Sequence, residues 1–250
     1  MNKKIIIANW KMNPLSAKEA IKIAKGTDLK GVILCAPTIY LKVIKKVIKK
    51  AKLGSQNVSV ENPLSGVGAF TGEVSAKMLY DIGSRYTIVG HSERRAMGET
   101  NQIINKKIKV LIDTAITPVL CIGEIERDEN HEYLNIVKHQ IEECLFGLNK
   151  NLLSKIIIAY EPVWAIGKNA LREATPAEFL EMKIFTKKVL VNIFGDKVEM
   201  PAMLYGGSVD EKNTRWFAID GGADGFLVGR ASLDPKKFKE IVKICETLNK

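Results

Sequence analysis

The residue with the clearest chemical potential is Glu161, which follows the apolar run 156–159 and directly precedes Pro162. The run is typical of a strand buried on both faces of a parallel sheet, and a proline holds the residue before it in extended geometry. An apolar segment, 163–166, comes next. A carboxylate beside such a flap loses solvation, and desolvation makes a carboxylate a stronger base. A lone Glu at a strand end is more often an ordinary solvated residue, so this interpretation depends on its neighbours.

His91 directly follows another predicted strand and opens the segment 90–95. An imidazole at the start of a helical turn is favoured in its neutral form, in which it donates a hydrogen bond. The other two histidines, His131 and His139, fall on a polar helical face and read as solvated surface. No carboxylate or histidine stands at metal-ligand spacing from His91, so we expect no metal site.

Asn9 and Lys11 end the first predicted strand and alternate around Trp10, so both should point to the same side. A lysine and an amide on the inner side of a strand end are costly to bury unless an anionic ligand pairs with them. A lysine that extends to solvent explains this segment equally well.

Glycines follow two further predicted strands, in the segments 205–208 and 227–230. Glycines at neighbouring strand ends, each before a helix, suit a nest of backbone N–H groups that binds phosphate. Tight turns need the same glycines, so each segment alone is weak evidence. The two together favour a phosphate site over plain turns.

These residues combine a base, a neutral donor, a cation and a phosphate nest. Such a set suits removal of a proton next to a carbonyl group in a small phosphorylated substrate. It includes no activated nucleophile, because Ser208 lies in no Gly-x-Ser-x-Gly turn and Ser92 only follows His91 in sequence.

The elements that must position these residues alternate along the chain as short apolar runs and longer helical patterns. The strand-like runs are 5–10, 31–36, 53–58, 86–90, 117–122, 155–160, 202–206 and 224–228. The helical patterns are 16–25, 40–51, 74–82, 99–113, 131–146, 175–193, 210–217 and 235–247. Eight such pairs without a linker predict an α/β fold in which residues 1–250 form a single (β/α)8 barrel domain. A doubly wound sheet is less favoured, because no Gly-x-Gly-x-x-Gly follows the first strand.

Helix ends are marked by their own residues. The segment 175–178, Thr-Pro-Ala-Glu, predicts a capping box. Gly26, Gly83 and Gly147 stand where helices should end and predict left-handed caps.

Composition limits the classes of function. The net charge of +10 favours anionic partners in general, but many lysines alternate with apolar residues, as in 41–50, and form solvated helix faces. No aromatic interleaving accompanies them, so we expect neither nucleic acid nor a membrane as partner. Four scattered cysteines without Cys-x-x-Cys spacing indicate a reduced, cytoplasmic protein. No apolar run approaches the roughly 18 residues of a membrane span.

Eight segments, in order along nearly the whole chain, resemble the triosephosphate isomerase family. They are NWKMN at 9–13, QN at 56–57, GAFTGE at 68–73, GHSERR at 90–95, CIGE at 121–124, AYEPVWAIG at 159–167, YGGSV at 205–209 and GFLVG at 225–229. The resemblance implies a TIM barrel and an isomerase of glycolysis and gluconeogenesis that interconverts dihydroxyacetone phosphate and D-glyceraldehyde 3-phosphate. It implies no cofactor and no metal.

The resemblance also implies the roles of the reacting residues. Glu161 would move a proton between C1 and C2 of the substrate. Neutral His91 would polarise the carbonyl group and carry protons between the two oxygens. Lys11 and Asn9 would stabilise the enediolate. Backbone N–H groups at four positions would bind the phosphate, namely Gly167, Ser208, Gly229 and Arg230.

Further residues would support this set. Ser92 would bond to Glu161 before a lid, 163–168, closes, and Glu93 would act as an acid behind the site. Closure would bring Ile166 and Leu227 against the carboxylate of Glu161 as an apolar clamp. The loop around Thr71 would insert into a partner subunit near Lys11, which implies a homodimer.

Two departures from the family pattern stand out. Arg230 occupies a position where the family usually has glycine, and a positive φ there would strain an arginine. The stretch 168–173 is longer than its family counterpart and lacks glycine, so the C-terminal hinge of the lid should behave differently.

Two other functions fit parts of the pattern. A phosphate- or nucleic-acid-binding protein on a degenerate barrel would use the charge of +10, but binding alone needs no base such as Glu161. Another barrel enzyme acting on a phosphosugar is disfavoured by the eight family motifs.

Overall fold

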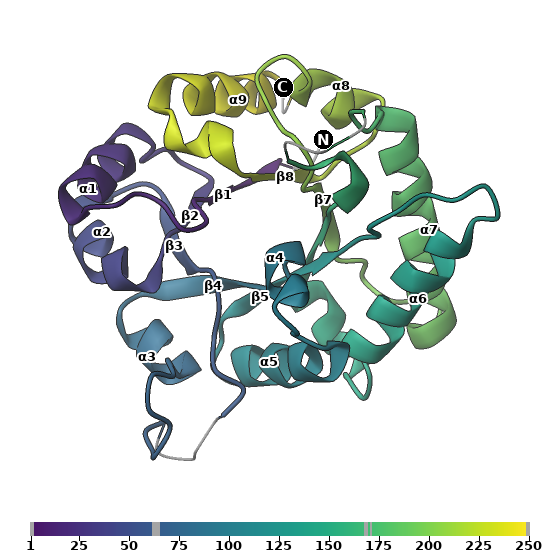
Figure 1. Ribbon diagram of the computed structural model, residues 1–250, viewed down its shortest axis with the longest axis horizontal. Coiled ribbons are helices and arrows are strands. Elements are labelled where there is room, and N and C mark those ends of the chain that lie inside the picture. The colour runs from purple at the N-terminus through teal and green to yellow at the C-terminus, as the bar shows by residue number, and fades with distance from the viewer. Residues whose placement is uncertain (1–2, 62–65, 168–169, 171, 249–250) are drawn as a thin grey trace.

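Eight parallel strands close into a barrel in the order in which they occur along the chain. The structure, a computed structural model, describes residues 3–61, 66–167, 170 and 172–248. β1 (Ile5–Asn9) pairs with β2 (Val32–Cys35) on one side and with β8 (Gly225–Val228) on the other, which closes the sheet (Figure 1). The other strands are β3 (Lys52–Ser55), β4 (Ser84–Val89), β5 (Thr117–Ile122), β6 (Ile157–Tyr160) and β7 (Ala202–Tyr205). The predicted α/β fold, a (β/α)8 barrel, is confirmed.

Helices cover the outside of the barrel (Figure 1). The α-helices are α1 (Ala17–Gly26), α2 (Leu41–Val47), α3 (Ala76–Asp81), α4 (Ser92–Ala96), α5 (Asn101–Asp113), α6 (Glu132–Cys144), α7 (Pro176–Phe194), α8 (Thr214–Ile219) and α9 (Pro235–Thr247). Short 3-10 helices are η1 (Thr38–Tyr40), η2 (Lys150–Lys155), η3 (Val163–Ala165) and η4 (Arg230–Leu233).

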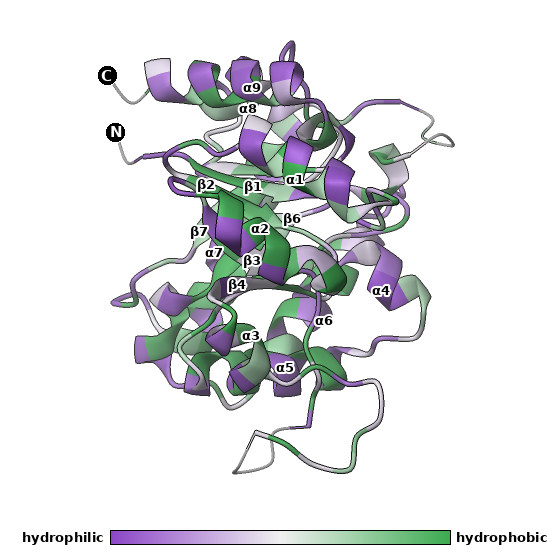
Figure 2. Cartoon of the chain, turned by 90° about the vertical axis from the view of Figure 1, so that its left-hand side faces the viewer, coloured by the Kyte–Doolittle hydropathy of each residue, from purple (hydrophilic) through white to green (hydrophobic). Residues whose placement is uncertain are grey.

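The core has two layers because successive residues of a strand point to opposite faces. On β1, Ile7 belongs to the smaller apolar cluster, which fills the barrel, whereas Ile6 and Ala8 belong to the larger one under the helices. Both faces are buried, so strands such as β1, β2 and β6 are nearly continuous apolar runs, and the strands of the barrel appear largely green in Figure 2. Many lysines of the outer helices face solvent, as predicted, although Lys107 of α5 is buried. In α1, for example, Ile23 is buried and Lys22 is exposed.

Capping follows the prediction at the start of α7. The backbone N–H of Glu178 donates to the Thr175 hydroxyl, and the Glu178 carboxylate accepts from the Thr175 N–H, which completes the capping box. Gly83 and Gly147 have positive φ, as predicted. The prediction for Gly26 was wrong, because its φ is not positive. A Cβ at Gly26 would lie 2.7 Å from Cγ of Pro235, so close packing accounts for this glycine.

Several element boundaries differ from the predictions. The helix predicted over 40–51 ends at Val47, because Ile48 is extended. The one predicted over 210–217 begins at Thr214, since the Asp210 side chain instead accepts from the N–H groups of Lys212 and Asn213 in a turn. The short elements α4 and η4 are absent from the predicted helical patterns, because five and four residues are too few for a helical period, although a helical turn was expected after His91.

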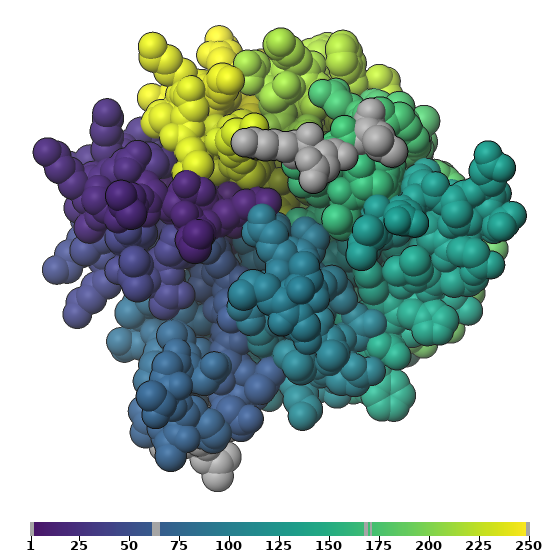
Figure 3. Space-filling view, in the orientation of Figure 1, coloured from purple at the N-terminus to yellow at the C-terminus, as the bar shows by residue number. Residues whose placement is uncertain are grey.

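The two ends of the barrel differ. α4 lies at one end, where the carboxyl ends of the strands emerge, and the N- and C-terminal segments lie at the other (Figure 2). The viewer of Figures 1 and 3 faces the end that carries α4.

Candidate active site

A cavity of about 500 Å³ opens at the carboxyl ends of the strands, on the face seen in Figure 3. Most of the residues predicted for the site line it, namely Asn9, Lys11, His91, Glu161, Ile166, Gly167, Ser208, Leu227, Gly229 and Arg230. Ser92 and Glu93 stand just behind this wall, in contact with Glu161 and Lys11 respectively. Thr71 does not line the cavity and belongs to the connection between β3 and α3, which extends away from the barrel (Figure 1).

Glu161 is the most enclosed acid in this cavity, with only 3% of its surface exposed. It directly follows β6, and its backbone N–H donates to the Ile122 carbonyl at 2.8 Å, which extends the sheet by one step. One carboxylate oxygen accepts from the Ser92 backbone N–H at 2.9 Å, and the other lies 3.0 Å from Nε2 of His91. The carboxylate is thus held by two donors beside open space.

Two glycines make room for Glu161. A Cβ at Gly123, after β5, would lie only 1.8 Å from the Glu161 carbonyl oxygen. A Cβ at Gly206, after β7, would lie 3.2 Å from Cγ of Glu161. The main chain of Gly123 is held in turn by the Gln140 side-chain amide, which accepts from its N–H at 2.8 Å and donates to its carbonyl at 2.9 Å.

The hydrogen bonds of His91 define its tautomer. His91 is the N-cap residue of α4, and its Nδ1 accepts from the Glu93 backbone N–H at 3.2 Å. A peptide N–H is always the donor, so Nδ1 carries no proton and the ring proton resides on Nε2. Nε2 points to Glu161 at 3.0 Å. The imidazole therefore presents a neutral N–H donor to the cavity.

Lys11 reaches the cavity by a turn, not by the strand alternation that was predicted. β1 ends at Asn9, and Lys11 has a φ of 51°, a left-handed conformation that costs a non-glycine residue roughly 1–3 kcal/mol. The Asn9 side chain accepts from the Lys11 N–H at 3.0 Å, and the Gln56 amide donates to the Lys11 carbonyl at 3.0 Å. The Lys11 ammonium group forms an ion pair with the Glu93 carboxylate, with 2.7 Å between Nζ and Oε1.

Arg230 does not carry the strain that a positive φ would impose. It begins the 3-10 helix η4, and its φ is not positive. The preceding Gly229 has φ −83° and ψ −112°. A Cβ at Gly229 would meet no atom closer than 3.8 Å, where the nearest is Cε of Lys11. The arginine is thus compatible with the backbone at this turn.

The apolar segment after Glu161, residues 163–166, is held in place through the side chain of Trp164. Its indole N–H donates at 2.8 Å to Glu124, a fully buried carboxylate that also accepts from the Tyr160 hydroxyl at 2.6 Å. The Arg127 and Arg172 guanidinium groups lie over the indole ring, with centroid distances of 5.6 and 4.5 Å. The predicted end of the lid, Lys168, lies outside the described residues.

Cys121 lies inside the barrel, close enough to Glu161 to feel its charge. Burial, with Glu161 nearby, raises the pKa of its thiol well above the usual value. A thiol in that state is a poor nucleophile. Within the described ranges, no three His, Cys, Asp or Glu side chains are grouped so that they could hold a metal ion.

The roles of Gly123, Glu124 and Gln56 as positioning residues were not predicted. All three fall inside the family motifs, which were the only signal for them. Glu173 and Asp210 also line the cavity and carried no sequence signal.

Comparison with known proteins fits this geometry. The family model for triosephosphate isomerase matches residues 4–245. The chain belongs to the triosephosphate isomerase family. The triosephosphate isomerase of Dictyoglomus thermophilum is 40% identical over 97% of this chain and 100% of its own length. That of Dehalococcoides mccartyi is 41% identical over 98% of this chain and 97% of its own, and that of Ruthia magnifica is 39% identical over 97% and 99%.

Family membership disfavours the other predicted functions, a phosphate- or nucleic-acid-binding protein on a degenerate barrel and a different phosphosugar enzyme. Among the described residues, no helix has the length and apolarity to span a bilayer.

Proposed function

We propose that the cavity interconverts dihydroxyacetone phosphate and D-glyceraldehyde 3-phosphate, with Glu161 as the base. The chain is an isomerase of the family, a glycolytic activity. One observation carries the assignment of the base. The nearly buried Glu161 carboxylate and the neutral imidazole N–H of His91 line the same cavity, and their O and Nε2 atoms lie 3.0 Å apart. Since the Ser92 peptide N–H also holds the carboxylate, Glu161 must exchange both bonds to reach a substrate carbon.

Glu161 removes a proton from C1 of dihydroxyacetone phosphate and returns it to C2. The electron pair of the broken C–H bond forms the C1–C2 double bond of an enediolate, and the negative charge collects on the former carbonyl oxygen. An oxyanion is stabilised by donors that are already oriented. The N–H of His91 meets that need, because Nδ1 is occupied by the Glu93 N–H and fixes the ring. The same Nε2 position can give and take the proton that moves between the two oxygens.

Lys11 supplies the positive charge opposite this oxyanion, and Asn9 helps to position it. The left-handed turn at Lys11 places its side chain in the cavity, and the Asn9 side chain stabilises that turn. Its partner Glu93 is exposed, with 58% of the side chain accessible, so the ion pair is readily exchanged for a phosphorylated substrate.

The phosphate binds to backbone N–H groups of Gly167, Ser208, Gly229 and Arg230. This assignment is supported by their common position on the cavity wall. Arg230 contributes its N–H from the start of η4, where the backbone is not strained. Ile166 and Leu227 line the same wall and act as the apolar clamp when the segment that begins at Val163 closes.

The whole chain acts as one domain and as a homodimer in the cytoplasm. Support for the homodimer comes from large apolar side chains around Lys11 and Thr71. Met12 and Leu15 are each 96% exposed, and Phe70 is 42% exposed. Apolar groups so exposed are typical of a surface that another subunit covers. The four cysteines are all buried and free, which suits a reducing compartment.

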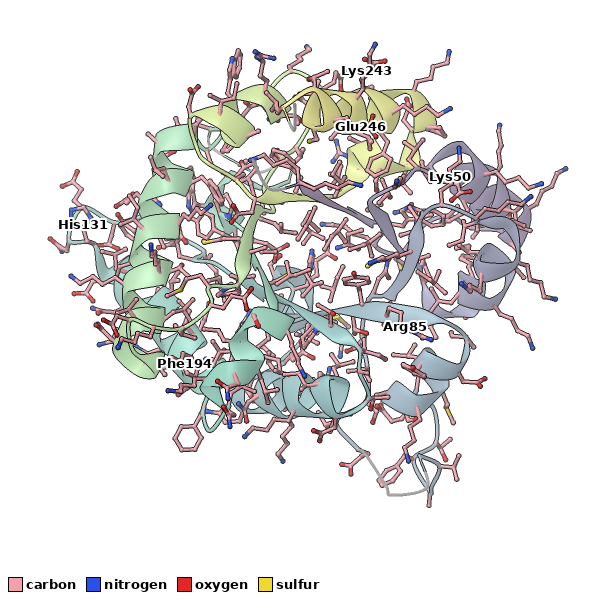
Figure 4. All side chains as sticks on the ribbon, turned by 180° about the vertical axis from the view of Figure 1, so that it is seen from behind. Lys50, Arg85, His131, Phe194, Lys243 and Glu246 are labelled. Atoms are coloured by element: carbon pink, nitrogen blue, oxygen red, sulfur yellow. The ribbon has the colours of Figure 1, made fainter. Side chains whose placement is uncertain are left out.

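A coupled assay with D-glyceraldehyde 3-phosphate tests the function. Glu161→Asp withdraws the carboxylate by about 1 Å and should lower kcat by about 10²-fold or more. The matched control is Glu246→Asp, the same change at an exposed position of α9 (Figure 4), which should leave kcat unaltered. Near-normal turnover by Glu161→Asp would exclude Glu161 as the base.

A further inference from the structure

A second cavity lies at the opposite end of the barrel from the catalytic one. It has a volume of about 430 Å³, within the range of small-molecule sites. It is formed by the amino ends of β1, β6 and β7, by Asp224 just before β8 and by residues of α7, and it shares no lining residue with the catalytic cavity. Figure 4 shows the barrel from this side.

The wall of this cavity is apolar on one side and basic on the other. Ile5, Ile158, Leu190 and Met203 supply the apolar part. The charged groups are three lysines and one carboxylate, namely Lys3, Lys183, Lys187 and Asp224. They leave an excess of two positive charges beside an apolar surface.

The lysines differ in how they are paired. Lys183 is already engaged, since it donates to the Gly222 carbonyl at 2.6 Å and to Asp224 at 2.9 Å. Asp224 accepts in addition from the Met203 N–H at 2.9 Å. Lys3 and Lys187 are exposed and make no hydrogen bond or ion pair with any described residue. The two uncompensated charges therefore belong to flexible side chains at the rim.

A polar group in the wall is also unsatisfied. Thr186 on α7 is 2% exposed, and its hydroxyl has no hydrogen-bond partner among the described residues. Buried hydroxyl groups nearly always have a partner, and an exception calls for an explanation. A ligand oxygen, or a water that the ligand holds, would supply that partner.

We propose that this cavity binds a phosphate monoester with a short aliphatic body. A dianionic head matches the excess of two charges, and Lys3 and Lys187 can close over it from the rim. The aliphatic body fits the apolar wall formed by Ile5, Leu190 and Met203. Inorganic phosphate lacks the body and hexanol lacks the head, so each alone should bind much more weakly.

The methionines allow a test that needs no turnover. Met200 and Met203 line the cavity, whereas Met12 follows Lys11 at the catalytic end. With 13C-methyl methionine labelling, hexyl phosphate should shift the Met200 and Met203 resonances in a saturable way. The double variant Lys3→Met, Lys187→Met should weaken this binding about tenfold or more, since charge-assisted contacts to the head group are lost. Thr186→Val should weaken it less.

The matched control is Lys239→Met, Lys243→Met, which removes the same charge from exposed positions of α9. It should leave the affinity within about twofold, because neither lysine lines the cavity and exposed charges are screened by salt. The proposal is overturned if hexyl phosphate shifts only Met12, if hexanol binds as tightly, or if both double variants weaken binding equally. None of these outcomes bears on the isomerase assignment, because Glu161 and His91 are untouched.

Discussion

Gly123→Ala should strongly lower kcat, although Gly123 does not line the catalytic cavity. The added Cβ would lie 1.8 Å from the Glu161 carbonyl oxygen, and real Cβ atoms essentially never come closer than 3.0 Å to a neighbour. The backbone at Glu161 must therefore move by at least about 1.2 Å. A misplacement of about 1 Å can cost 10²-fold in rate. We expect kcat to fall by about 10²-fold, with a smaller change in KM because three of the four phosphate-binding residues, Ser208, Gly229 and Arg230, follow other strands.

The assay is steady-state turnover of D-glyceraldehyde 3-phosphate, with far-UV circular dichroism as the measure of folding. Gly195→Ala is the matched control, because its Cβ would meet no atom within 4 Å and Gly195 lies at the end of α7. Its φ of 90° disfavours alanine, so the control should lose about 1 kcal/mol of stability and keep its kcat.

A second variant separates folding from positioning. Gln140→Leu removes both hydrogen bonds that hold the Gly123 main chain and adds no atom near Glu161. It should lower kcat less than Gly123→Ala does. The fall in kcat should nevertheless exceed the fraction of protein that is unfolded. A folded Gly123→Ala protein with wild-type kcat would refute the reasoning that Glu161 tolerates no displacement.

Three further outcomes can be measured. His91→Gln should raise the barrier by roughly 3 kcal/mol, as for loss of an oxyanion donor, and unchanged kcat would exclude His91 as the electrophile. Burial alone would raise the pKa of Glu178, but hydrogen bonds from Arg172 and Thr175 lower it to about 2. Because its pKa is lowered on folding, ionised Glu178 contributes to the free energy of unfolding at every pH above its ordinary pKa of 4.5. This contribution is lost as the pH falls from 4.5 toward 2. Arg172→Met should therefore reduce stability at pH 7 and flatten its decline between about pH 4.5 and 2; urea unfolding with an unchanged decline would contradict this. Arg230→Gly should change kcat/KM less than tenfold, since Arg230 is not strained; a larger gain would show that the arginine impairs the site.

The sequence was sufficient for the architecture because eight apolar runs alternate with eight helical patterns. A strand buried on both faces needs a run such as Ile156–Ala159, whatever its neighbours do, so local pattern and fold agree. Helix ends were less predictable. Gly26 was misread because a glycine that is needed for contact with Pro235 looks the same in sequence as one that is needed for its φ.

The site was predictable where a residue follows a strand, as Glu161 and His91 do. It was less predictable where the chain leaves regular structure. The left-handed turn at Lys11 depends on contacts from Asn9 and the distant Gln56, and no local pattern encodes a contact across that separation. The role of Gly123 depends in the same way on a neighbouring strand.

The two bonds that orient the reacting side chains have a consequence for how the chain tolerates mutation. Glu161 and His91 both accept from peptide N–H groups, those of Ser92 and Glu93. Every amino acid except proline carries that donor. Genetic drift at these two positions can alter local charge and size without removing either bond. The path of the main chain therefore sets the orientation of the base and the electrophile. At positions 92 and 93, only a substitution by proline would remove one of these donors.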